Sequence, residues 1–198
     1  MIVIGRKGRQ VQYQLTPVDE MIEPSAEELV CILRAADAII FAAGRDMLAK
    51  LLKGSKDKKV LAHGLDQSIV YGCFRERTLA DITKMIDWMI RSRYLAVEYD
   101  GRLPMIVFAE KGWERYKPIY AHELHQIILK TTGDEAVQEL VEKLKNKNRE
   151  VILTLLEQMA ESKNIGVIRF LEKWKETEVK KVRARINWAI AQIRRAGS

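Results

Sequence analysis

The sequence predicts a mostly α-helical protein with one small β hairpin, an α+β fold that continues into an all-helical module. Apolar residues recur three and four positions apart from Leu79 to Ile90, a spacing typical of an amphipathic helix. Directly afterwards, two apolar stretches flank Asp100-Gly101, which is a strong signal for a two-residue hairpin. From about Tyr120 the strand signals vanish and helical spacing continues to the C-terminus.

These patterns divide the 198 residues into three segments. We expect a basic arm or hairpin at 1–23, a domain of helices and a hairpin at 24–119, and a helical domain at 120–198. A hydrophobic content of 47% is normal for a globular protein and predicts a real core. The net charge of +7 favours a polyanionic partner.

Several classes of protein are disfavoured by the composition. Cys31 and Cys73 are too few for a disulfide scaffold or a four-ligand zinc site, and their apolar and aromatic neighbours predict buried free thiols. His122 and His125 are expected to form a surface pair without a third ligand. No catalytic arrangement stands out, so we expect no enzyme activity, metal or cofactor. Without a signal peptide or an apolar run of membrane length, we expect a cytoplasmic, nucleoid-associated protein.

The first helices are predicted by their caps. Residues 2–15 alternate loosely, as in a short hairpin or a flexible basic arm. Ser25 follows a proline and precedes two glutamates, so it is expected to cap the first helix. A second helix is expected over 37–53, with Gly54 at its C-terminal cap. Thr78 is the expected N-cap of the helix that runs to Ile90.

The hairpin and the C-terminal helices complete the prediction. The expected strands are 94–99 and 105–108, with Pro104 suited to a sheet edge. The later helices have HEAT-like features, although their pattern is too degenerate to define a repeat. The expected helices are 120–130, 134–145, 148–162, 164–175 and 178–195.

A cluster of lysines follows the second predicted helix. Lys53, Lys56, Lys58 and Lys59 surround Ser55, and Asp57 alone offsets their charge. A hydroxyl and free N–H groups at a helix boundary can bond phosphate oxygens, while lysines supply charge. The alternative is a solvated lysine loop with no ligand.

Helices, a loop, another amphipathic helix and a hairpin form the order of a winged helix. The lysine segment at 52–60 resembles the basic Gly-Ser segment of the RQC domain, the winged helix of RecQ-type helicases. The resemblance covers roughly residues 30–117 and is closest to the small stand-alone bacterial RQC-minor DNA-binding proteins. Its other matching features are Tyr71-Gly72, Thr78 with its helix, the strand at 94–99, and Ala109-Glu110-Lys111-Gly112.

This resemblance implies a DNA-binding surface. Ser55 and Lys59 would contact backbone phosphates, and Arg75 and Thr78 would lie near phosphate, although Thr78 could serve as a cap only. Thr83 is expected on the helix face that could meet DNA. The full candidate set is Lys53, Ser55, Lys56, Lys58, Lys59, Arg75, Arg77, Thr78, Thr83, Lys84, Tyr99, Arg102 and Leu103.

The wing contributes the last three candidates. Tyr99 lies at the base of its tip, Arg102 could hold a phosphate or enter a groove, and Leu103 could act as an apolar wedge. Trp88 is expected to be a half-buried core residue. The sequence contains neither a phosphate-binding P-loop motif nor the zinc module that often precedes the RQC domain, so we expect no ATP-driven unwinding by this chain alone.

We therefore expect a non-enzymatic protein that binds duplex or forked DNA mainly through phosphates. The alternatives are a sequence-specific winged-helix transcription regulator, which would discriminate strongly between sequences, and a protein-interaction adaptor. The basic C-terminal segment from Lys173 could extend the DNA footprint, but a solvated helix face is the favoured interpretation. A protein partner or a homodimer through these helices is equally open.

Overall fold

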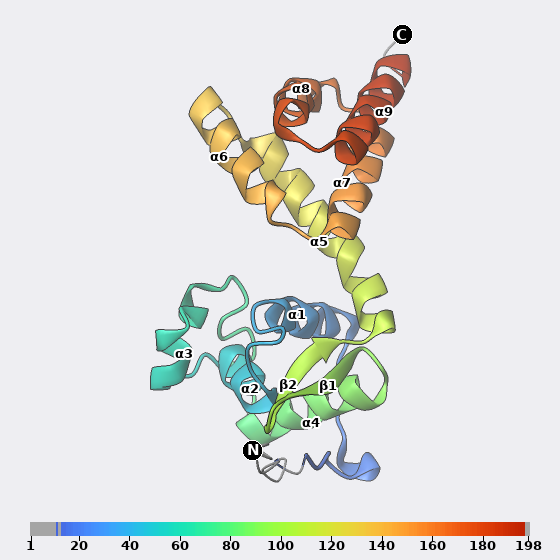
Figure 1. The fold of residues 1–198 in the computed structure, drawn as a ribbon. Coiled ribbons are helices and arrows are strands. Elements are labelled where there is room, and N and C mark those ends of the chain that lie inside the picture. The colour runs from blue at the N-terminus through green and yellow to red at the C-terminus, as the bar shows by residue number, and fades with distance from the viewer. Residues whose placement is uncertain (1–10, 12, 197–198) are drawn as a thin grey trace, which may run out of the picture. The chain divides into compact units, whose positions relative to one another are not determined.

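The computed structural model describes residues 11 and 13–196 of the chain. These residues form two compact units, unit 1 within Met1–Tyr116 and unit 2 within Lys117–Ser198. Unit 1 combines helices with a two-stranded antiparallel sheet, and unit 2 is helical throughout its described part (Figure 1). The predicted class, mostly α with a small β wing, is confirmed. The elements of unit 1 are η1 Val18–Glu20, α1 Ala26–Asp37, α2 Arg45–Lys53, α3 Lys58–Ala62, η2 Leu65–Gln67, α4 Leu79–Arg91, β1 Leu95–Asp100 and β2 Leu103–Phe108.

Local capping chemistry sets the predicted helix ends. The Ser25 hydroxyl accepts from the backbone N–H of Glu28 at 3.3 Å, and the Glu28 carboxylate accepts from the Ser25 N–H at 2.9 Å. This reciprocal capping box begins α1 and confirms the predicted cap. Gly54 ends α2 with a left-handed φ of 74°, and Thr78 caps α4.

The second helix begins at Arg45, so the predicted start at residue 37 was wrong. Ile106 of β2 donates its N–H to the Ala43 carbonyl at 2.9 Å and accepts from the Phe41 N–H at 3.3 Å. The chain between α1 and α2 therefore forms hydrogen bonds with a strand more than sixty residues further along the chain, instead of continuing the helix. At Gly44 a Cβ would lie 2.6 Å from the Pro104 carbonyl oxygen, which explains the glycine at this close approach.

The core of unit 1 lies where α2 packs on α1 and α4, with α1 against β2 and α4 against β1. Most of its large, fully buried apolar side chains come from these helices, and Ile106 of β2 is equally buried. Trp88 is half-buried and its ring stacks on that of Tyr94, as expected for an edge of the core. The helical contributors are Ile32, Leu33, Leu48, Leu51, Leu52, Ile82, Met85, Ile86 and Met89.

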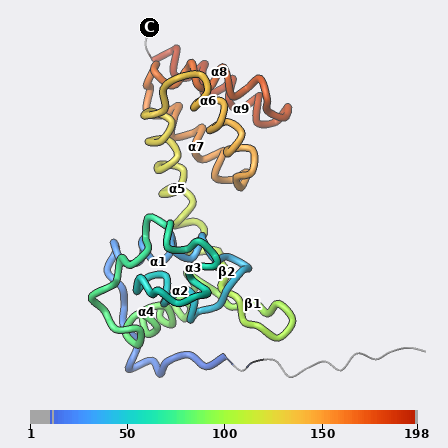
Figure 2. Tube along the Cα trace, turned by 90° about the vertical axis from the view of Figure 1, so that its left-hand side faces the viewer, coloured from blue at the N-terminus to red at the C-terminus, as the bar shows by residue number. Residues whose placement is uncertain are grey.

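The two strands form the predicted hairpin, with a shifted turn. The last pair in the register is Asp100 with Leu103, so the two loop residues are Gly101 and Arg102, whereas Asp100-Gly101 was predicted. Gly101 has a positive φ of 58°, the conformation that favours glycine in tight hairpins. Figure 2 shows the hairpin extending away from the helices of unit 1.

The helix after the wing begins earlier than predicted. Helix α5 spans Glu110–Lys130 and passes through Pro118, whereas 120–130 was expected. Proline usually marks a helix end, which is why the sequence favoured the later start. Gly112 in its first turn lies against the turn between α4 and β1: a Cβ there would be 1.8 Å from the Tyr94 carbonyl oxygen. The glycine of the Ala109–Gly112 motif thus permits the helix to pack closely against this turn.

Unit 2 continues from α5 with four further α-helices among the described residues. Three of the predicted ranges agree with them to within two residues, whereas the α-helix predicted at 164–175 begins at Ile168, after a 3-10 turn. Their HEAT-like character stays a prediction. Helix α9 (Lys180–Ala196) packs on α7 (Arg149–Ser162) and α8 (Ile168–Thr177) (Figure 1). Trp174 is fully buried, and its Nε1 donates to the Glu178 carboxylate at 2.8 Å. The elements are α6 Asp134–Lys145, α7 Arg149–Ser162, η3 Ile165–Val167, α8 Ile168–Thr177 and α9 Lys180–Ala196.

The predicted histidine surface pair was wrong. His122 is exposed, but His125 is buried, with 4% of its surface exposed, and its Nε2 has no hydrogen-bond partner. His125 belongs to the packed face of α5, because Ala121, Leu124 and Ile128 at helical spacing around it are also buried. Burial lowers the pKa of His125, and the nearby His122 lowers it further.

We expect unit 2 to lose stability as the pH falls from 7.5 to 5.5. The His125 pKa is depressed below its ordinary 6.5, so the unfolded chain binds the extra proton first. The contribution is fully present above that value and is lost at lower pH, at up to about 1.4 kcal/mol per pH unit. Urea unfolding at several pH values measures it. In a His125→Leu variant the same pH window should show a flatter dependence; an equal slope in both proteins would contradict the assignment.

Candidate nucleic-acid interface

Two glycines hold the basic loop, which we define as residues 53–59, against the segment before α4. A Cβ on Gly54 would lie 2.9 Å from the Gly72 Cα, so the two backbones approach closely. The Gly72 N–H donates to the Leu51 carbonyl at 3.0 Å, and the Phe74 N–H to the Leu52 carbonyl at 2.9 Å. The end of α2 thereby fixes the chain that leads to α4.

The aromatic residue of the Tyr71-Gly72 pair positions the hydroxyl-bearing part of the basic loop. The Tyr71 hydroxyl donates to the Ser55 carbonyl at 3.0 Å. The Ser55 hydroxyl accepts from the Asp57 N–H at 3.2 Å, so its own hydrogen remains available to donate. These bonds explain in physical terms why an aromatic–glycine pair lies sixteen residues after the Ser55 loop.

Asp57, the acid within the lysine cluster, forms hydrogen bonds that stabilise the local fold. Its carboxylate accepts from the Lys59 N–H at 2.8 Å, which caps the five-residue helix α3, an element that the sequence did not predict. It also pairs with the Lys50 ammonium at 2.7 Å. The hydrogen bond from Lys50, followed by that from Lys59, lowers the pKa of Asp57. Its negative charge is therefore directed to Lys50 and to the helix end.

The lysines on either side of Asp57 face solvent. Lys56, Lys58 and Lys59 are exposed, and none of them makes a side-chain hydrogen bond or ion pair within the described residues. Three ammonium groups within four positions, beside the Ser55 hydroxyl, form a local cationic surface. Such a surface can exchange its small counterions for the phosphates of a polyanion.

Lys53 and Arg75 connect this surface to the segment that precedes α4. The Lys53 ammonium donates to the carbonyl oxygens of Arg75 and Arg77, the second at 2.7 Å. The Arg75 side chain is exposed and donates from Nε to the Gly72 carbonyl at 3.3 Å, which leaves its terminal nitrogens for a ligand. Lys53 thus orders the site, while Arg75 extends the cationic surface of the basic loop.

Arg77 and Thr78 are engaged within the protein. Arg77 forms an ion pair with Glu28 of α1, and its hydrogen bond contributes to the lowered pKa of Glu28, after the larger effect of the Ser25 backbone N–H. The Thr78 hydroxyl accepts from the Asp81 N–H at 3.1 Å and donates to the Asp81 carboxylate at 2.7 Å. Both hydrogen-bonding roles of that hydroxyl serve the helix cap.

The predicted DNA-facing pair on α4 also has internal partners. The Thr83 hydroxyl donates to the Leu79 carbonyl at 2.8 Å, and Lys84 lies 3.5 Å from the Glu20 carboxylate. Leu79, expected on the buried stripe, is instead 42% exposed at the start of the helix. No described hydrogen bond links Thr83 or Lys84 to the basic loop.

The wing lies beside the opposite end of the lysine cluster. A cavity of about 500 Å³ is lined by both Lys59 and Leu103, together with Tyr13 and Arg45. Leu103, the first residue of β2, is 57% exposed. The structure therefore brings the basic loop and the wing to one side of unit 1.

A segment before α1 runs along the wing. The Tyr99 hydroxyl donates to the Val11 carbonyl at 3.0 Å, and the Val11 N–H donates to the Arg102 carbonyl at 3.2 Å. The described residues 11 and 13–17 contain no strand. The rest of the predicted arm or hairpin, residues 1–10 and 12, lies outside the described residues.

A buried ionic cluster next to the cavity was missed by sequence reasoning. Asp87 of α4 is completely buried and accepts from the Arg45 guanidinium at 2.7 Å and from the Thr16 N–H and hydroxyl at 2.8 and 2.7 Å. The Arg45 guanidinium lies 4.8 Å from the centre of the Tyr13 ring. The available signal was a carboxylate on the apolar face of α4, which requires a buried partner.

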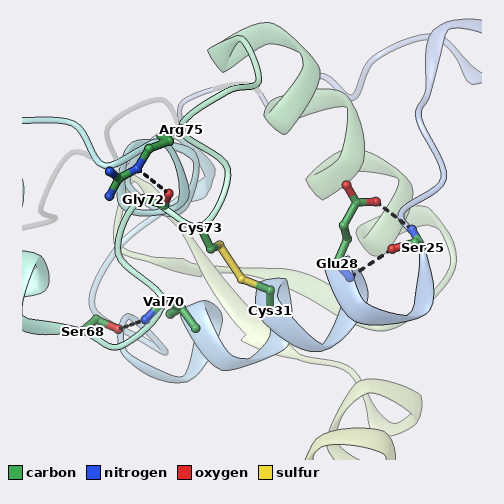
Figure 3. The surroundings of a disulfide bond; sticks show 8 residues. All are labelled: Ser25, Glu28, Cys31, Ser68, Val70, Gly72, Cys73 and Arg75. Carbon is green, nitrogen blue, oxygen red and sulfur yellow. Dashed lines mark hydrogen bonds between the residues drawn. A yellow bond between two sulfur atoms is a disulfide. The ribbon is translucent and has the colours of Figure 1, made fainter.

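The cysteines form a disulfide, so the prediction of buried free thiols was wrong. Cys31 of α1 is joined to Cys73 in the segment before α4, forty-two residues along the chain (Figure 3). Cys31 is half-buried and Cys73 exposed. The bond fastens α1 to the segment that carries Arg75, whose side chain lies over Gly72 in Figure 3.

Two further properties of the described residues bear on function. Across residues 11 and 13–196, no helix is both long and apolar enough to cross a membrane. In the same residues, histidine, cysteine and acidic side chains do not gather in threes at a possible metal site.

The helices, the hairpin and the basic loop define a winged-helix type of domain with a cationic surface. The sequence model of the RQC domain matches residues 21–125, just over half of the chain, and the protein belongs to this family. The chain is also 31% identical over 84 residues to the ATP-dependent DNA helicase RecQ of Bacillus subtilis. That match covers 42% of this chain and 13% of the helicase, so the chain spans a small part of that relative. No solved structure gives a significant match.

Proposed function

We propose that unit 1 binds duplex or forked DNA mainly through backbone phosphates. The observation that carries the proposal is the arrangement of the basic loop: three exposed lysines without internal partners, beside a serine hydroxyl that the fold positions. Membership of the RQC domain family supports DNA as the polyanion. Arg75 extends the surface at one side, and the wing residue Leu103 lies at the other.

The thirteen candidate residues take different roles in this proposal. Ser55, Lys56, Lys58, Lys59 and Arg75 form the phosphate-binding centre. Arg102 and Leu103 at the wing contact the DNA next to it. The remaining candidates order the surface through the internal bonds described above: Lys53, Arg77, Thr78, Thr83, Lys84 and Tyr99.

Neutralising the basic loop should weaken DNA binding and reduce its salt dependence. Each lost phosphate contact removes about 0.9 from the slope of log K against log salt, so three should remove up to about 2.7. Fluorescence anisotropy with a labelled duplex at several salt concentrations measures both quantities. We define the loop variant by the substitutions Lys56→Gln, Lys58→Gln and Lys59→Gln.

A matched control removes the same charge elsewhere. The control variant has three substitutions on exposed helix positions of unit 2, and its slope should stay close to that of the unchanged protein. An equal loss in the two variants would show that net charge, and not the basic loop, determines binding. We define the control variant by Lys130→Gln, Lys143→Gln and Lys145→Gln.

In this proposal the protein docks on DNA, catalyses no reaction itself and is located with the DNA at the nucleoid. The relative named above is a helicase, and the RQC-like part would supply contact with the substrate and not the unwinding step. A sequence-specific regulator is the second candidate, because a winged helix can read base edges. Binding of one sequence orders of magnitude above scrambled DNA would favour the regulator.

A further inference from the structure

The net positive charge of the chain comes mainly from the helix α9. Residues 1–116 contain 18 basic and 16 acidic residues, and residues 117–179 contain 10 basic and 11 acidic ones. Helix α9 contains six basic residues and no acidic residue. It therefore supplies almost the whole net charge of +7, more than the unit that contains the basic loop.

The fold leaves these charges on the solvent side of α9. One face of the helix is buried against α7 and α8, through a stripe that includes Ile186 and Ile190. The basic residues lie around the remaining surface (Figure 1 shows the helix at the edge of unit 2). Arg185 is half-buried. The other five are exposed: Lys180, Lys181, Arg183, Arg194 and Arg195.

Three of the six basic side chains of α9 have no partner among the described residues. Arg185 pairs with Glu157 at 2.6 Å, and Arg183 donates to the Glu178 carbonyl at 2.8 Å. Lys180, Lys181 and Arg195, in contrast, make no side-chain hydrogen bond or ion pair with any described residue. Arg194 lies 3.2 Å from Glu172 on the surface, a pair that solvent and salt screen.

Helix stability accounts for Arg194 and Arg195 in the last turn of α9, but not for the lysines at its start. Cations at the start of a helix oppose its dipole, and acids are favoured there. Two helices of similar length follow the rule: α1 begins with Glu27 and Glu28, and α6 with Asp134 and Glu135. Helix α9 instead begins with two lysines and has no acid in its first turn. A bound polyanion would remove this repulsion.

An aromatic side chain lies within the cationic face. Trp188 is 36% exposed, and the Arg185 guanidinium lies 3.7 Å from the centre of its ring. Basic side chains interleaved with an exposed aromatic ring are typical of nucleic-acid surfaces, where the ring contacts sugar or base. The combination favours a nucleic acid over a purely acidic peptide.

We propose that the exposed face of α9 is a second phosphate-binding surface, which contacts the same DNA molecule as unit 1. The identity of the polyanion rests on the proposed function. Two contacts on one chain raise the affinity beyond that of either, because the second binding event is intramolecular. The chain would then neutralise more phosphates than the basic loop can reach.

The test measures the salt dependence of the full-length protein on a labelled duplex long enough for both surfaces, about 40 base pairs. The α9 variant should lower the affinity at least tenfold near physiological salt and make the salt slope shallower by up to about 2.7. The control variant, with its substitutions on α5 and α6, loses the same charge. Its affinity and its salt slope should both change much less. We define the α9 variant by Lys180→Gln, Lys181→Gln and Arg195→Gln.

The outcomes separate this inference from the proposed function. An α9 variant that binds like the control variant, while the loop variant is impaired, overturns the inference and leaves the proposed function intact. Impairment of the α9 variant with an unimpaired loop variant supports α9 and contradicts the site in unit 1. Unchanged DNA binding by the α9 variant, with lost binding to vesicles of anionic lipid, would assign the helix to a membrane surface and overturn the inference.

Discussion

Replacing Asp87 by alanine should destabilise unit 1 by about 3–5 kcal/mol. Asp87 is fully buried and accepts hydrogen bonds from both Arg45 and Thr16. The alanine variant leaves the Arg45 guanidinium partly buried without its carboxylate, and Nε of that arginine already has no partner. Urea unfolding followed by circular dichroism gives the loss directly.

Two companion variants show whether the loss comes from the broken ion pair. Glu98→Ala removes an exposed carboxylate of β1 and should change stability by no more than about 0.5 kcal/mol. The double variant Asp87→Leu with Arg45→Met removes both charges and should be less destabilised than Asp87→Ala. If the double variant is the less stable of the two, desolvation of the unpaired arginine is not the cause.

Reduction of the disulfide between Cys31 and Cys73 should lower the stability of unit 1 by about 2–4 kcal/mol. The bond closes a loop of forty-two residues, and opening that loop returns conformational freedom to the unfolded chain. The loop contains α2, α3 and the basic loop, so its opening affects the elements that carry the proposed DNA surface. Unfolding with and without a thiol reductant measures the difference.

The reductant needs a control of its own. A protein with Cys31→Ala and Cys73→Ala has no bond to reduce, so its unfolding should be the same in both conditions and should resemble that of the reduced protein. Equal stability of the oxidised and reduced forms of the unchanged protein would contradict the prediction.

The features that local chemistry determines were predictable from the sequence. Ser25, Gly54 and Thr78 mark helix ends because each satisfies or adapts backbone groups within a few residues of itself. The hairpin required only its two apolar strands and a glycine, although the exact loop residues differed by one. Fold class therefore followed from short-range patterns.

The features that the sequence did not predict depend on contacts between distant segments. The start of α2 is set by bonds from Ile106, and the disulfide joins residues forty-two positions apart. Asp87 is a single acid on an apolar helix face, and its partners Arg45 and Thr16 are 42 and 71 residues away in the chain. No local periodicity encodes such pairs.

In the candidate site, too, local residue types were predictable and long-range partners were not. Residue types and the family resemblance pointed to the basic loop as a candidate site, and its Lys56, Lys58 and Lys59 are exposed. They did not distinguish the free ammonium of Lys56 from that of Lys53, which bonds two carbonyls, or from the Arg77 guanidinium, which pairs with Glu28. Whether a cation is available to a ligand depends on its neighbours in the fold.

The most direct test of phosphate-based DNA binding is a salt titration of the unchanged protein with two duplexes of equal length and unrelated sequence. We predict dissociation constants within about threefold of each other, and a slope of log K against log salt of about −3.6 or steeper, from at least four phosphates at about 0.9 each. Absence of binding at low salt, or binding with a slope near zero, would contradict the proposal.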